Sequence, residues 1–189
     1  MNFQLTATSS RGNSDVIDAT GVTLTTLHYE DWFSSTASAT VAGRPVQIKT
    51  RNIWQSNFDI LIGGIDRGDL MSNWKGHIII KFVAENGVPC SFLLKAKGFW
   101  QQHFVLENEQ GASVLEMHPS FKWQNMHYNY AVQFPENEFS PFDRQLLLVT
   151  CGAQSVHDDD GRGCGLIKFM TVPTLSSGSS IYLQNRIYS

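Results

Sequence analysis

One segment near the end of the chain, residues 140–156, limits its possible folds more than any other. It reads S-P-F-D-R-Q-L-L-L-V-T-C-G-A-Q-S-V. Ser140 can cap a helix, Pro141 suits the first helical position, and Asp143 lies three residues after the cap. The residues that follow are apolar on almost every side of such a helix, so the helix has to be buried on almost every side. About four turns cannot span a bilayer, which needs roughly 20 apolar residues. The sequence therefore predicts a helix inside the protein.

The remainder of the chain alternates between polar and apolar residues with the period of β-strands. A bulge or sharp bend is expected at Gly63-Gly64 and a tight turn at 66–69. Asn86-Gly87 is a strong hairpin signal. Residues 9–14 are expected to form a turn or a flexible link. The segments with strand character are 2–8, 22–29, 35–41, 46–51, 57–65, 77–84, 89–95, 100–107, 112–118 and 126–134.

Ten to twelve short strands at regular spacing are typical of a β-sandwich or a β-barrel. A sandwich fills its core with side chains from two sheets and leaves no room for a helix. A closed barrel of about a dozen strands has a lumen that something must fill. The sequence therefore predicts a mainly β protein, a closed antiparallel barrel of about twelve strands that encloses a central hydrophobic C-terminal helix.

Several segments carry a resemblance to a known family. They are F-D-I-L-I-G-G-I from Phe58, W-K-G-H-I-I-I from Trp74, F-V-L-E-N-E-Q-G-A-S-V-L-E-M from Phe104, W-Q-N-M-H-Y-N-Y from Trp123, and L-L-L-V in the helix. In order and rhythm, residues from about 2 to 156 resemble the Tubby C-terminal-like superfamily, which includes tubby proteins, LURP-one-related proteins and phospholipid scramblases. The resemblance implies a twelve-stranded barrel threaded by a hydrophobic helix. It also implies a non-enzymatic protein that binds a membrane lipid headgroup or a protein partner.

The chain departs from the family pattern after Val156. We expect residues 1–156 to form the barrel domain, with its central helix at 140–156. Residues 157–189 begin with the charged, glycine-rich sequence H-D-D-D-G-R-G-C-G and continue as a linker and C-terminal tail. Their content of glycine, serine and aspartate predicts that folding does not require them. Whether the tail packs on the barrel is left open by the sequence.

Composition narrows the functional class. The formal net charge of −3 gives no overall attraction to nucleic acid, which is not expected as a partner. Three widely spaced cysteines indicate reduced thiols rather than a disulfide framework. The N-terminus lacks the basic and apolar regions of a signal peptide, and no transmembrane segment is expected. These features predict a cytoplasmic protein, either free or peripheral at the membrane.

No pattern of residues predicts catalysis, a metal or a cofactor. Asp158, Asp159 and Asp160 lack the spacing of a calcium loop, and Cys151 on an apolar helix is expected to be inert. The tryptophans can form a ligand platform, but barrel aromatics more often pack the core or seal its ends. The six histidines lack the spacing of zinc ligands; they are His28, His77, His103, His118, His127 and His157.

Lys49 and Arg51 are the candidate ligand-binding residues. The K-x-R spacing places both cations on one face of a strand, about 7 Å apart, opposite Val46 and Ile48. In tubby proteins a lysine and an arginine of similar spacing bind phosphoinositide headgroups, so the resemblance implies that role here. Solvated charges that protect a strand edge are the alternative. The competing functional hypothesis is a scaffold or stress-associated module with no small ligand.

Overall fold

The structure is a computed structural model that describes residues 1–9, 12–29, 36–52, 55–98, 103–122, 127–135 and 139–157. It contains twelve strands followed by one helix. The strands are β1 Asn2–Ala7, β2 Ser14–Asp18, β3 Thr23–Tyr29, β4 Thr36–Val41, β5 Arg44–Asn52, β6 Gln55–Ile62, β7 Ile65–Ser72, β8 Ile78–Val83, β9 Pro89–Lys97, β10 His103–Asn108, β11 Ser113–Lys122 and β12 His127–Gln133, and the helix is α1 Pro141–His157.

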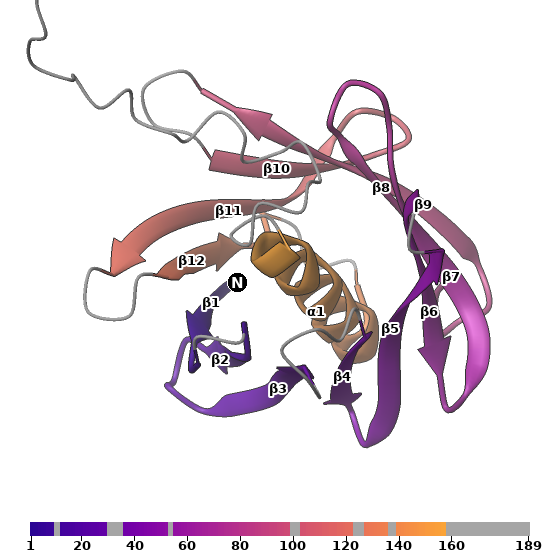
Figure 1. Ribbon diagram of the computed structural model, residues 1–189. Helices are drawn as coiled ribbons and strands as arrows, with labels where there is room; N and C mark the ends of the chain where they lie inside the picture. The colour runs from indigo at the N-terminus through magenta and orange to yellow at the C-terminus, as the bar shows by residue number, and fades with distance from the viewer. Residues whose placement is uncertain are drawn as a thin grey trace, which may run out of the picture.

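Each strand pairs antiparallel with the next, and the first pairs with the last, so the sheet closes on itself. The closing pair aligns Phe3 of β1 with Val132 of β12, and both side chains are buried. Figure 1 shows the strands as a ring around the helix. The predicted closed antiparallel barrel of twelve strands with a C-terminal helix is confirmed.

The helix α1 begins as its sequence predicts. The Asp143 N–H donates to Ser140 Oγ at 3.0 Å, which satisfies a free donor of the first turn. The Asp143 carboxylate also accepts the Glu85 N–H at 3.0 Å and so ties the helix to the β8–β9 connection. Further along, every residue from Leu146 to Ala153 is buried, as the strands that surround the helix require. The helix therefore fills the barrel and supplies much of its core (Figure 1).

Two local predictions are wrong. The sequence predicted no strand between residue 9 and Val22, whereas Ser14–Asp18 forms β2 between β1 and β3. This segment is short and polar, so its strand conformation comes from pairing with two neighbours and from burial of Val16 rather than from its own pattern.

The predicted tight turn at 66–69 is the second error, because these residues lie inside β7. The chain reverses instead at Gly63-Gly64, where the sequence predicted a bulge or sharp bend. Gly68 faces β8 so closely that an added Cβ would lie 2.1 Å from the Lys81 carbonyl oxygen. The glycine in this turn-like sequence therefore permits a close approach of two strands instead of a reversal.

The two ends of the barrel differ in the chain segments and connections that lie there. At one end β1 begins, β12 ends and α1 begins, and we call this the entry end. The connections at this end are 19–22, 42–43, 63–64, 84–88 and 109–112. The connection 73–77 lies at the opposite end, which we call the far end. Within the described part of the chain, α1 falls short of the length and apolar character that crossing a bilayer requires.

Candidate functional site

Lys49 and Arg51 lie where strand alternation predicts. Both are exposed on the outer face of β5, while Val46 and Ile48 point into the core. Pairing with β4 on one side and β6 on the other holds β5 in the barrel wall. The two cations therefore project from a rigid surface, and neither lies on an open sheet edge.

Acidic residues from neighbouring strands stand beside these cations. Across β5, β6, β7 and β8 the register aligns Lys49 with Asp59, Asp59 with Asp69, and Asp69 with Lys81. Directly opposed side chains in such a sheet lie within about 5.5 Å of each other at Cβ. The outer wall thus carries a charged row in which two carboxylates lie between two lysines.

Arg51 is already engaged within this wall. Its Nε donates to Asp59 Oδ1 at 2.7 Å, and its Nη2 forms an ion pair with the same oxygen. The hydrogen bond with Asp59 raises the pKa of the Arg51 guanidinium, a group that is already charged at every physiological pH. Lys49 forms no ion pair among the residues that the structure describes. An anion at this surface would meet Lys49 directly and would compete with Asp59 for Arg51.

The sequence contained a partial signal for the acidic partners. Alternation over β6 places Phe58 and Ile60 inside the barrel, which leaves Asp59 outside. Which outward residue of β6 faces Lys49 depends on the register of the β5–β6 pair, which includes a shift between Thr50 and Asn52. A shift of this kind is set by three-dimensional pairing, and alternation along one strand does not reveal it.

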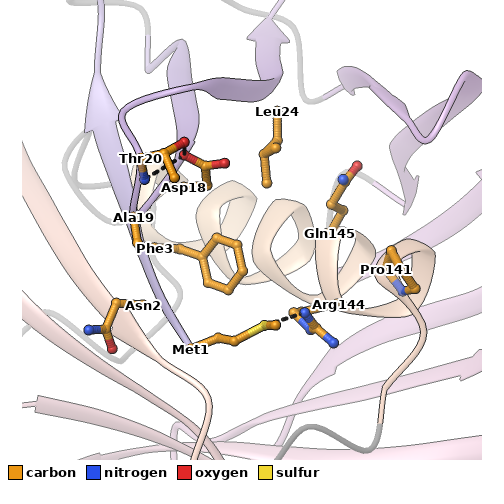
Figure 2. Close-up of a pocket in the computed structure, with 10 residues that line it drawn as sticks. All are labelled: Met1, Asn2, Phe3, Asp18, Ala19, Thr20, Leu24, Pro141, Arg144 and Gln145. Carbon is orange, nitrogen blue, oxygen red and sulfur yellow. Dashed lines mark hydrogen bonds between the residues drawn. The ribbon is translucent and has the colours of Figure 1, made fainter.

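An apolar cavity of about 370 Å³ opens at the entry end, between α1 and the start of β1. Figure 2 shows the side chains of Met1, Phe3 and Leu24 beside the first turns of the helix. Arg144 reaches the Met1 sulfur and donates to the Phe139 carbonyl oxygen at 2.8 Å.

Asp18, also in the lining of this cavity, accepts hydrogen bonds from the Thr20 hydroxyl at 2.6 Å and from the Val22 N–H at 2.9 Å. The Thr20 hydrogen bond lowers the pKa of the Asp18 carboxyl. These polar groups are occupied by local contacts, so the cavity mainly offers apolar surface.

The other residues considered from the sequence do not assemble into a reactive site. Burial raises the pKa of the Cys151 thiol to about 12, as suits an inert core residue. The imidazoles of His103 and His118 stack 5.3 Å apart, yet the described residues contain no group of three or more metal-ligating side chains. Asp158, Asp159 and Asp160 lie outside the described residues.

The expectation for the tryptophans is wrong at Trp74. This side chain is 91% exposed at the far end, where its ring lies 5.1 Å from Lys75 Nζ, and it packs no core. Its place in the 73–77 connection accounts for this exposure, since no strand or helix covers it. The other four lie outside the described residues; they are Trp32, Trp54, Trp100 and Trp123.

Comparisons with known proteins reveal one similar structure. No family model matches the chain, and no curated protein matches it. Among solved structures, the chain is similar to the X-ray structure of a protein from Arabidopsis thaliana, with 14% sequence identity and a TM-score of 0.48. The similarity covers 86% of this chain and 92% of that one. The closed barrel of twelve strands around a buried helix is the architecture that the resemblance of the sequence to the Tubby C-terminal-like superfamily implies.

Proposed function

We propose that this chain is a non-enzymatic barrel that binds an anionic membrane lipid headgroup of the phosphoinositide kind, in the cytoplasm at the membrane surface. The observation that carries the proposal is the presentation of Lys49 and Arg51 side by side on the outer wall of β5. Arginine offers a planar fork for phosphate oxygens, and lysine offers a compact charge. Because both project outward, a headgroup can reach them without the burial of an unpaired charge.

The acidic wall determines how strong this binding can be. A phosphate group has to displace the Asp59 carboxylate from Arg51, so part of the interaction energy is spent on that exchange. The net charge of −3 adds no long-range attraction to an anionic membrane. We therefore expect weak binding that decreases as salt is raised, since exposed charges are screened over about 8–10 Å.

The first prediction is that the double change Lys49→Ala and Arg51→Ala abolishes flotation with vesicles that contain phosphoinositide. Stability should change by no more than about 0.5 kcal/mol, as is usual for surface positions. Lys75→Ala is the matched control for Lys49→Ala, because Lys75 is an exposed cation at the far end. Equal loss of flotation in both single variants would show that total charge matters and that this site does not.

The second prediction is a gain of binding in Asp59→Asn. The amide keeps the size of the carboxylate and removes the charge that engages Arg51, so flotation with phosphoinositide vesicles should increase. Urea unfolding would show whether the variant remains folded. If the wild-type protein fails to float with any of the vesicles at low salt, the lipid proposal is wrong and the scaffold hypothesis replaces it.

A further inference from the structure

We propose a second anion site, in a cavity at the entry end where Arg44 and Arg67 converge, which takes the phosphate monoester group of a membrane lipid. The cavity has a volume of about 330 Å³, within the usual range for ligand pockets. Its lining comes from three hairpin connections of the barrel and from Phe142 in the first turn of α1. It is therefore built from segments that lie far apart in the sequence.

Arg67 reaches this cavity because β7 is irregular. The register pairs Ile60 with Gly68 and Leu61 with Asp66, which leaves Arg67 as the extra residue of a β-bulge. Bulges redirect the side chain of the extra residue. Arg67 is exposed and forms no hydrogen bond or ion pair among the described residues, so its guanidinium is available to a ligand.

Arg44, at the start of β5, is held in position by two contacts. Its Nη2 lies 2.7 Å from Glu85 Oε1, and its guanidinium carbon lies 4.7 Å from the centre of the Phe142 ring. The Arg44 side chain is nevertheless 52% exposed. An ordered guanidinium loses less conformational freedom when it binds phosphate, so these contacts prepare Arg44 for a ligand.

The lining has a net positive charge and two guanidinium groups, which favours an anion that can accept hydrogen bonds from both. Arg44 and Arg67 contribute two positive charges, and Glu85 contributes one negative charge. A phosphate monoester carries about −1.5 to −2 at neutral pH and has three acceptor oxygens. It can accept from both guanidinium groups at once, whereas a singly charged group satisfies this site less completely.

Two exposed apolar residues in the hairpins that line the cavity point to a lipid as the source of the phosphate. Ile65 and Val88 are 60% and 52% exposed, and they belong to the β6–β7 and β8–β9 hairpins whose residues line the cavity. A membrane surface presents phosphate beside acyl chains. The two arginines can therefore bind the phosphate while Ile65 and Val88 contact the acyl chains. A free phosphate in water would give the apolar pair no partner.

This inference rests on the proposed lipid-binding function for its class of ligand, but not on Lys49 or Arg51. The two sites use different residues, one on the outer wall and one at the entry end. Variants of each site can therefore separate them in the same flotation assay.

The test compares full-length variants on phosphatidylcholine vesicles with and without phosphatidic acid. Arg67→Gln should weaken binding to phosphatidic acid vesicles at least about tenfold, since it removes charge-assisted hydrogen bonds. Glu85→Gln should strengthen binding, because it releases Arg44 from its carboxylate partner. Lys75→Ala is the control; it removes an exposed cation that belongs to neither site and should leave this binding within about twofold, the usual effect of a distant surface charge.

A separate comparison tests the role of Ile65 and Val88. Ile65→Ser together with Val88→Ser should weaken vesicle binding but leave binding of soluble glycerol phosphate, measured by calorimetry, unchanged. Trp74→Ser is the control, because it removes an exposed apolar side chain from the far end. If Arg67→Gln binds phosphatidic acid vesicles as tightly as the wild type, the inference is overturned, and the wall site at Lys49 and Arg51 is judged by its own variants.

If the protein binds glycerol phosphate but not the phosphatidic acid vesicles, the site takes a soluble phosphate ester and the assignment to a membrane lipid is wrong.

Discussion

Gly68 shows how one missing side chain shapes this barrel. An added Cβ at this position would lie 2.1 Å from the Lys81 carbonyl oxygen and 2.7 Å from the Phe82 Cα. Both atoms belong to the backbone of β8, which cannot move without disturbing the ladder that it forms with β7. The close approach of these strands, and with it the bulge that carries Arg67, depends on glycine.

We predict that Gly68→Ala destabilises the protein by about 1–3 kcal/mol or more, as overpacking does. Gly152 in α1 is the matched control, because an added Cβ there would lie 3.7 Å from Leu27 Cδ2, an ordinary contact. Gly152→Ala should stabilise the helix by up to about 1 kcal/mol. Urea unfolding of both variants measures the difference, and equal stabilities would contradict the role assigned to Gly68.

Cys151 links the interior of the barrel to pH. Burial raises the pKa of its thiol from an ordinary value of 9.0 to about 12, so the folded state keeps a proton that the unfolded state releases. The resulting stability is fully present below about pH 9 and is lost as the pH rises toward 12.

At about pH 8 we therefore expect Cys151 to resist thiol reagents until the protein unfolds. Peptide mapping by mass spectrometry distinguishes it from Cys90, which is half-buried and should react slowly. Rapid modification of Cys151 under native conditions would mean that the helix leaves the barrel readily.

The helix α1 is the element on which the core depends most. Leu147 is completely buried, and Leu146 and Leu148 beside it are buried to the same extent. A helix buried on every side gains its stability from tertiary packing, since a segment of this length is marginal alone in water. Loss of its packing should therefore affect the whole barrel cooperatively.

We predict that Leu147→Asp costs several kcal/mol and prevents stable folding, because it buries a charge without a partner. Leu147→Met is the control, since it preserves volume and should cost less than about 1.5 kcal/mol. Circular dichroism melting curves compare the two variants. A melting temperature unchanged by Leu147→Asp would place the helix outside the core.

The sequence predicted the elements that have a strong local pattern, but not those whose conformation depends on pairing between strands. The capped apolar helix and the hairpin at Asn86-Gly87 could be predicted because their signals lie within a few residues. β2 could not, because its strand conformation depends on β1 and β3. At the site, alternation predicted the outward face of Lys49 and Arg51, but not the carboxylate of Asp59 that engages Arg51. The convergence of Arg44 and Arg67 was equally hidden, because it requires a bulge and the closure of the barrel.

At the scale of the whole molecule, closure by β1 and β12 and filling by α1 complete the barrel within residues 1–157. The sheet has no free edge, and its interior is occupied. We therefore expect the core to form without the residues that follow the helix.

We predict that a chain ending at Val156 is soluble and unfolds in one cooperative transition, close to the midpoint of the full chain. Differential scanning calorimetry provides the measurement, and agreement between calorimetric and van't Hoff enthalpies tests cooperativity. Insoluble or molten material would show that residues beyond 156 complete the core.

The pairing of the first strand with the last also means that the barrel can close only late in translation. Phe3 cannot meet Val132 until the ribosome has translated about 130 residues, which takes roughly 6 to 26 seconds at 5–20 residues per second. The helix that fills the interior is made later still. During this interval the nascent chain exposes inward-facing apolar residues and two unpaired strand edges, the features that chaperones recognise. A ribosome that stalls during this interval would therefore carry an incomplete sheet with exposed apolar residues, whereas synthesis of α1 shortly afterwards allows the barrel to close around its core.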